Sequence, residues 1–499
     1  MSIQPYGSGA LAARQAVDAF RNLKTDLASL EGQLSTGRAA DNYAGLGAGA
    51  ATSLSTRSAL STLEGYAANV TDAKVRVSLM SQAVGRLAQM ASGLATSLPQ
   101  GLNGNPVGQT SSTISASDAL QQAIELLNTD MGGRYLFSGR SADTEPVASY
   151  ASLIDGEPGR AGLRQLIAER KEADLGAGGR GRLVPGGSGI DATLTEEAAG
   201  LPFGMKLTSA TATGTGITAA RSAGPPPSVA MNVAAQPADG DAVTIEFGLP
   251  DGTSERITLT ARADGAIGPS ANAFAIGATP AATAANLRAA LDAAVRTTAT
   301  TALASASTRK AAESFFAGSA SSPPERVAGP PFATATGTVP GTSANTTVWY
   351  AGDDAAGSAR GTSPVRTGDG AGVAIGARAN EPGIRSVLAA LGALAADTFP
   401  ASDATSAARY TALAQRISAA SGTSPVQDIA TDFGVANAQL GQAATRLSAA
   451  KVQLNDTLGE VENADPNEAA AKLLATQTRL QASYQVTSTV AQLSLVNFI

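Results

Sequence analysis

The pattern of apolar positions predicts a long helix over residues 465–499. Steps of three and four residues connect one mildly apolar stripe, which consists of Ala469, Leu473, Thr476, Leu480, Tyr484, Thr487, Ala491, Ser494 and Phe498. Val486, Val490 and Leu493 widen the stripe on one side. At ~1.5 Å of rise per residue this helix would be about 50 Å long, too long and too weakly apolar to be stable alone in water. It therefore needs partner helices.

Further segments also have helical periodicity. Residues 11–34 present an apolar face made of Val17, Phe20, Leu23, Leu27, Leu30 and Leu34. Residues 63–98 and 429–461 repeat apolar residues about every 3.5 positions, which is the spacing of a left-handed coiled coil. Asp465, Pro466 and Glu468 are the expected cap of the last helix. Shorter helices are expected at about 117–131, 281–316, 380–395 and 404–420.

The middle of the chain has a different pattern. Residues 151–235 are rich in Gly, Pro, Ala and Ser, so we expect loops and short extended pieces. Residues 241–261 alternate apolar and polar positions around a Pro-Asp-Gly-Thr turn, which predicts a β-hairpin. Together with helix 281–316 this hairpin would form a small α+β unit at about 240–318. Strands at 347–350 and 373–375 are expected to pair with each other.

These patterns predict a fold that is mainly α at both ends. The N- and C-terminal segments would form a long antiparallel helical coiled-coil bundle, with a central α+β, β-rich insert. The expected domains are three. Residues 1–40 with 465–499 would be the terminal helices of an inner assembly core, residues 41–150 with 378–464 a helical rod domain, and residues 151–377 a variable outer insert.

Composition excludes several kinds of function. A net charge of -6 and a pI near 5.0 give no electrostatic case for binding nucleic acid or an anionic membrane. The 499 residues include no Cys and no His, which removes thiol nucleophiles, Ser-His-Asp relays and the usual zinc ligands. No run of about 18 apolar residues predicts a membrane span. We therefore expect no enzyme activity, no catalytic, cofactor-binding or metal-binding residues, and no membrane insertion.

The first ten residues are polar and Gly-rich, unlike a cleaved signal peptide. The protein is therefore expected either to stay in the cytosol or to leave the cell by a route that needs no cleaved signal.

Short motifs that match known sites have simpler explanations. Residues 45–50 fit a dinucleotide-binding pattern, but no strand precedes them, so a hinge is favoured. Ser-x-x-Lys occurs at 307–310 and 448–451 without the companion motifs that a serine-lysine enzyme needs. At 132–139, a short aromatic strand is expected between glycines. It would be either a recognition site or a strand packed on a helix, with Gly133, Arg134, Tyr135, Phe137 and Gly139 as its residues.

The heptads alone would suit an ordinary bundle core. Thr476, Thr487 and Ser494 lie in the seam of the last helix, however, and small or polar seams suit packing among many copies of a subunit. The expected assembly interface consists of Val17, Phe20, Leu27, Leu34, Leu473, Leu480, Tyr484, Val490, Leu493 and Phe498.

Both ends of the chain resemble the bacterial flagellin superfamily. Residues 34–38, with Asp41 and Asn42, resemble the turn after its first helix. Residues 462–465, with Glu468, resemble the start of its C-terminal helix, and residues 493–499 are similar to its ending. Residues 133–139, followed by Asp143 and Pro146, resemble the hook-associated branch, the hook-filament junction (FlgL) type, more than filament flagellin.

This resemblance implies a secreted structural subunit of the flagellum. Its terminal helices would form an inner coiled-coil layer around an axial channel, and the insert would face solvent. It implies export by the flagellar type III apparatus without a cleaved signal, and an extracellular location. The implied partners are itself, other axial proteins such as hook-associated proteins and flagellin, and an export chaperone. Filament flagellin is the first alternative, and a secreted adhesin or enzyme carried by the insert is an alternative of another class.

Overall fold

In the computed structural model, residues 8–102, 104–263, 272–421 and 425–496 are described. The chain divides into two compact units. Unit 1 consists of Met1–Ala73, Val365–Val373 and Gln439–Ile499, and unit 2 of Lys74–Pro364 and Ala374–Ala438. Helical ends with a strand-rich middle confirm the expected fold class. The three expected domains stay a prediction, which this division into two units does not test.

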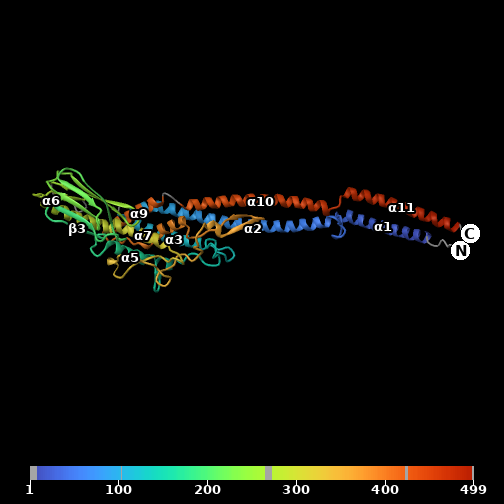
Figure 1. The fold of residues 1–499 in the computed structure, drawn as a ribbon, viewed down its shortest axis with the longest axis horizontal. Coiled ribbons are helices and arrows are strands. Elements are labelled where there is room, and N and C mark those ends of the chain that lie inside the picture. The colour runs from blue at the N-terminus through green and yellow to red at the C-terminus, as the bar shows by residue number, and fades with distance from the viewer. Residues whose placement is uncertain (1–7, 103, 264–271, 422–424, 497–499) are drawn as a thin grey trace. The chain divides into compact units, whose positions relative to one another are not determined.

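Unit 1 is built from helices. It contains α1 (Ser8–Thr36), the first part of α2 (Gly49–Ser97), the last part of α10 (Val426–Glu462) and α11 (Pro466–Val496). Helix α1 packs along α11 (Figure 1). The tip of a hairpin, β13 (Pro364–Gly368) and β14 (Ala371–Ala374), also belongs to unit 1, where the Tyr66 hydroxyl donates a 2.7 Å hydrogen bond to Asp369.

The heptad positions become buried as expected. Along α2, Val70, Val77, Val84 and Leu87 are at most 1% exposed, and Phe433 and Leu440 of α10 are fully buried. An apolar residue every 3.5 positions keeps one face of a helix against its neighbours over many turns, which is why this periodicity was readable from the sequence.

Unit 2 contains further helices. These are η1 (Leu98–Gly101), α3 (Pro106–Leu127), α4 (Tyr150–Ile154), α5 (Leu163–Leu175), α6 (Pro280–Thr298), a π-helical turn (Ala299–Leu303), α7 (Ala304–Ala317), α8 (Pro382–Ala396) and α9 (Ser406–Ser421). Helix α3 begins eleven residues before the expected position 117. It begins earlier because Asn105 caps it, accepting from Gly108 N at 3.3 Å, and because proline, here Pro106, is tolerated in a first turn.

Two four-stranded sheets form the β-rich part of unit 2. One has the order β3-β4-β7-β6, from β3 (Leu183–Gly186), β4 (Asp191–Glu196), β6 (Ile217–Ser222) and β7 (Ser228–Val233). The other has the order β10-β9-β8-β5, from β5 (Lys206–Ala212), β8 (Ala242–Gly248), β9 (Ser254–Arg262) and β10 (Ala273–Ala275). Helix α6 packs on both sheets, and Leu287, Leu291 and Val295 are buried there (Figure 1).

The expectation of loops and short extended pieces at 151–235 was only partly right. These residues form the short strands β3 to β7, but they also form the 13-residue helix α5, which was not expected. A strand such as β5, Lys-Leu-Thr-Ser-Ala-Thr-Ala, has little apolar alternation of its own, so its pairing with β8 decides its conformation. The hairpin at 241–261 is confirmed as β8 and β9, with Ile245 opposite Ile257.

The strands at 347–350 and 373–375 do not pair with each other. Tyr350 instead bridges to Val147, and β14 pairs with β13 across the tight turn at Gly370. Closing this short hairpin costs less chain entropy than closing a loop of more than twenty residues. The remaining short elements are β1 (Gly156–Glu157), β2 (Arg160–Ala161), β11 (Arg326–Val327), η3 (Phe332–Thr334), β12 (Thr338–Val339) and η4 (Ala359–Thr362).

Candidate assembly interface

Helices α1 and α11, the terminal pair, run antiparallel in unit 1. Phe20 and Leu27 of α1 and Leu473 and Leu480 of α11 are half-buried. The rings of Phe20 and Tyr484 meet edge to face, with centroids 5.2 Å apart and an interplanar angle of 78°. Such a pair contributes about 0.5–1.5 kcal/mol beyond its buried area. Two helices thus cover part of each other's apolar stripe, and none of these four aliphatic or aromatic side chains is fully covered.

Considerable apolar surface of the terminal pair stays exposed. The predicted interface residues Val17, Leu34 and Tyr484 are 51%, 45% and 56% exposed. Leu474 and Val486 are still more open, at 63% and 62%. A contiguous patch of exposed apolar groups is typical of an interaction surface, whereas single ones are ordinary.

Sequence reasoning missed Leu474. It lies next to Leu473 but off the periodic stripe, so the periodicity assigns it to no face. The signal that could have identified it is that Leu473 and Leu474 are consecutive, because one stripe of a helix takes up only one of two adjacent residues. Among the other predicted residues, the side chains of Val490 and Leu493 and the whole of Phe498 lie outside the described part of the chain.

The break between α1 and α2 contacts the break between α10 and α11. Arg38 and Asn463 form an antiparallel bridge. Ala39 N donates to Glu462 O at 2.7 Å, and Ala464 N donates to Gly37 O at 2.9 Å. Gly37 has a φ of +69°, a conformation that glycine adopts easily and that ends helices. The two segments that resemble flagellin at opposite ends of the sequence therefore lie against each other.

Side chains fasten this contact. The carboxylate of Glu462 accepts hydrogen bonds from Arg57 Nε at 2.8 Å and Arg57 Nη2 at 2.5 Å, and a further one from the Ser53 hydroxyl. These bonds, first that from Arg57 and then that from Ser53, lower the pKa of Glu462 from 4.5 to about 2, and the same pairing raises the pKa of Arg57. Fork-shaped arginine-carboxylate pairs fix geometry as well as charge. We call Ser53, Arg57 and Glu462, with the backbone bridge beside them, the elbow clasp.

The first turn of α11 is capped as expected. Asp465 Oδ1 accepts from Asn467 N at 2.8 Å and from Glu468 N at 3.4 Å, and Pro466 is the first helical residue. The negative charges of Asp465 and Glu468 also stabilise α11, because they lie at the positive, N-terminal end of the helix dipole. The start of α11 is therefore fixed directly after the elbow clasp.

The glycine motif, residues 133–139, lies in unit 2 and forms turns and single bridges, so the expected strand was wrong. Gly133 has a φ of +78° and its N donates to Asp130 at 2.9 Å. Phe137 is fully buried and its carbonyl accepts from Ala379 N at 2.9 Å. Gly139, with a φ of +65°, has no room for a side chain, because a Cβ there would stand 2.8 Å from Asp353 Cβ. Tyr135 is half-buried and Arg134 is exposed, so only Arg134 is fully available to a partner.

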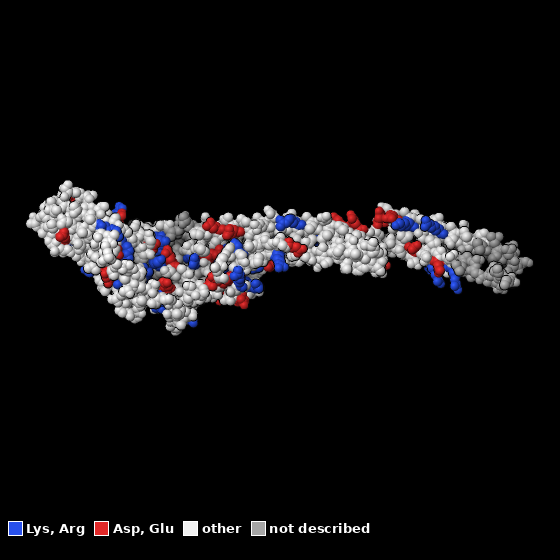
Figure 2. All heavy atoms as spheres, in the orientation of Figure 1, with Lys and Arg blue, Asp and Glu red and all other residues white. Residues whose placement is uncertain are grey.

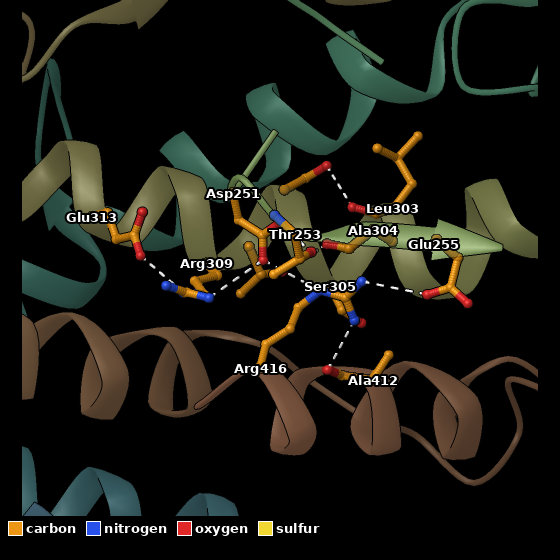
Figure 3. Close-up of polar contacts among 12 residues, drawn as sticks. Asp251, Thr253, Glu255, Leu303, Ala304, Ser305, Arg309, Glu313, Ala412 and Arg416 are labelled. Carbon is orange, nitrogen blue, oxygen red and sulfur yellow. Dashed lines mark hydrogen bonds and ion pairs between the residues drawn. The ribbon is translucent and has the colours of Figure 1, made fainter. Parts of the chain in front are cut away.

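A buried ionic group in unit 2 joins a turn to two helices. The side chain of Asp251, in the β8-β9 turn, is fully buried, with Arg416 Nε at 3.3 Å and Arg309 Nη1 at 3.6 Å (Figure 3). Figure 3 shows the two arginines reaching Asp251 from α9 and α7. Burial lowers the pKa of Arg416. Each charge faces an opposite one, so the group fastens the turn to both helices.

The described residues contain no group of three or more acidic side chains placed to hold a metal ion. Within the same part of the chain, no helix is long and apolar enough to cross a membrane. On the face drawn in Figure 2, basic and acidic side chains are interspersed rather than gathered by sign.

The comparisons with known proteins agree with this geometry. A family described as bacterial flagellin N-terminal helical region matches residues 9–142, and one described as bacterial flagellin C-terminal helical region matches residues 420–499. No curated protein matches the sequence. The flagellin family is structural and forms an extracellular part of the flagellum by self-assembly. The two matches, at the two ends that the terminal pair joins, support placing the chain in the flagellin superfamily as a structural subunit of the bacterial flagellum.

Proposed function

We propose that this chain is the flagellar subunit that joins hook to filament, and that the terminal pair is its assembly interface. The observation that carries the assembly role is the apolar surface of the terminal pair, on which Tyr484, Leu474 and Val486 are each more than half exposed. Neighbouring subunits would cover this surface. Burying apolar area is the main favourable term in such association.

The assignment to the junction rests on the glycine motif. In the sequence this motif resembles that of hook-associated proteins, and in the structure Gly133 and Gly139 both adopt positive φ values, which explains the need for glycine at these two positions. Filament flagellin is the second candidate, because the matching families carry the flagellin description at both ends. Immunogold labelling of detached flagella separates the two. A band at the end of the hook supports the junction role, and label along the whole filament overturns it.

The proposed partners are further copies of this chain, other axial proteins and an export chaperone. Export would use an uncleaved N-terminal signal. Comparing the N-terminus of the exported protein with that of the intracellular protein tests this, since a shortened exported chain would contradict it.

We also propose that the chain is not an enzyme and that the β-rich part of unit 2 is dispensable for assembly. Gly181 and Leu303 are close, because a Cβ on Gly181 would stand 2.8 Å from Leu303 Cδ2. Residues 182–302 can therefore be replaced by a short Gly-Ser linker, together with Arg416→Met, because the deletion removes Asp251 and Glu255, the carboxylates that face the buried Arg416. Assembly should survive this deletion. An adhesive or enzymatic activity carried by the insert would disappear while flagella still formed, and loss of assembly would show that this part is needed for it.

A further inference from the structure

The elbow clasp lies at the inner end of both terminal helices. Glu462 is the last residue of α10, and α11 begins four residues later. On the other side, Arg38 follows the end of α1 by two residues and bridges to Asn463. The C-terminal end of α1 and the N-terminal end of α11 are thus held at the same level by backbone and side-chain hydrogen bonds.

Packing within the terminal pair is tightest near the elbow clasp. Leu30 and Ala469 are buried, with exposed fractions of 8% and 3%. Farther along, Phe20 and Leu480 are half-buried, and Tyr484 is exposed although it still touches Phe20. Leu34, which is nearer to the elbow clasp, is exposed and lies outside this packed set.

The apolar stripe of α11 specifies its own register poorly. Ala469, Thr476 and Thr487 on it are small or polar. Its large residues, Leu473, Leu480 and Tyr484, are only half-buried or exposed, so a slide of one turn, about 5.4 Å, would uncover little apolar surface. If the apolar contacts do not fix the register of the two helices, other contacts have to fix it. In some coiled coils a single polar residue fixes the register.

We propose that the elbow clasp sets the register of the terminal pair, with Glu462 as the positioning residue, so that pairing extends from Leu30 and Ala469 toward the two chain ends. The outer parts of both helices are then left for neighbouring subunits. This inference rests on the proposed assembly function, whose interface it completes. Arg57 and Glu462 are suited to the task because a two-bond fork fixes orientation.

The other reading is an ordinary surface ion pair that leaves register unchanged. Unit 1 contains a matched example: Lys451 of α10 pairs with Glu64 of α2 at 2.8 Å, with both side chains about half exposed. This pair joins the same two helices as Arg57 and Glu462 but has no backbone bridge beside it. It therefore serves as the control.

Thiol cross-linking of the purified, unassembled chain measures the register. The sequence contains no Cys, so an introduced pair is unique. Phe20→Cys with Tyr484→Cys reports the observed register, and Phe20→Cys with Ser488→Cys reports a slip of one turn. With the elbow clasp intact, a short cross-linker should join the first pair several-fold more often than the second.

The variants decide between the two readings. Glu462→Gln should reduce the preference toward equality, and the exchanged pair Arg57→Glu with Glu462→Arg should restore most of it. Lys451→Ala should leave it unchanged. An unchanged preference in Glu462→Gln, an equal loss in Lys451→Ala, or no preference in the parent chain each overturns the inference. Because the assay needs no polymer, its result is separate from the localisation test of the proposed function.

Discussion

Leu474 provides the sharpest test of the assembly surface. In the single chain its side chain is 63% exposed, so little is lost on folding when it is shortened. Fully burying a leucine contributes about 1.5–3 kcal/mol, so covering the exposed part on assembly should contribute about 1–2 kcal/mol per subunit. Because about 1.4 kcal/mol corresponds to tenfold in an equilibrium constant, Leu474→Ala should raise the critical concentration for polymerisation about 5- to 30-fold.

Sedimentation of polymer over a series of total protein concentrations measures this critical concentration. The control is Thr478→Ala, an exposed residue one turn away on the same helix, which should shift it little. Thermal unfolding of both unassembled variants should stay within about 0.5 kcal/mol of the parent chain. A shift of less than about twofold for Leu474→Ala would refute the claim that neighbouring subunits cover this side chain.

Three further predictions follow from the described contacts. Leu480→Asp places a charge in the half-buried contact between α1 and α11, so it should prevent incorporation of the subunit into the flagellum while export continues. Normal motility with this variant would show that this contact is not needed for assembly. Asp397, which is 6% exposed, accepts from Lys171, which is 20% exposed, at 2.8 and 2.7 Å, and burial lowers the pKa of that lysine. Asp397→Ala should therefore cost about 2–3 kcal/mol in thermal or urea unfolding, because the lysine left behind can still reach water. Asp155→Ala, in an exposed ion pair, should cost less than about 1 kcal/mol. The folded-state pKa of Glu462, about 2, lies below the unfolded value near 4.5, so the stabilisation from its ionised carboxylate is present above pH 4.5 and is lost as the pH falls toward 2. The difference in melting temperature between the parent chain and Glu462→Gln should therefore shrink as the pH falls through this window. A constant difference would contradict the pairing of Glu462 with Arg57.

The sequence by itself determined the long helices, the cap of α11 and one hairpin. Heptad spacing places Val77 and Phe433 on buried faces whatever the neighbours are, because helix geometry alone brings residues three and four positions apart to one side. The cap at Asp465 is equally local, since its bonds reach only two and three residues along the chain. The β8-β9 hairpin was predictable for the same reason, because its turn and alternation lie within one short segment.

The tertiary structure decided what depends on distant partners. Strands β4, β5 and β6 are built from short segments rich in Ala, Ser and Thr, and they form because neighbouring strands complete their hydrogen bonds. The exposure of Leu474 follows from which face of α11 meets α1, which its own periodicity does not fix. The elbow clasp joins Arg57 to the carboxylate of Glu462, 405 residues away, and the sequence around either residue does not predict its partner. Local patterns record local geometry, whereas contacts across the fold depend on how the helices are brought together.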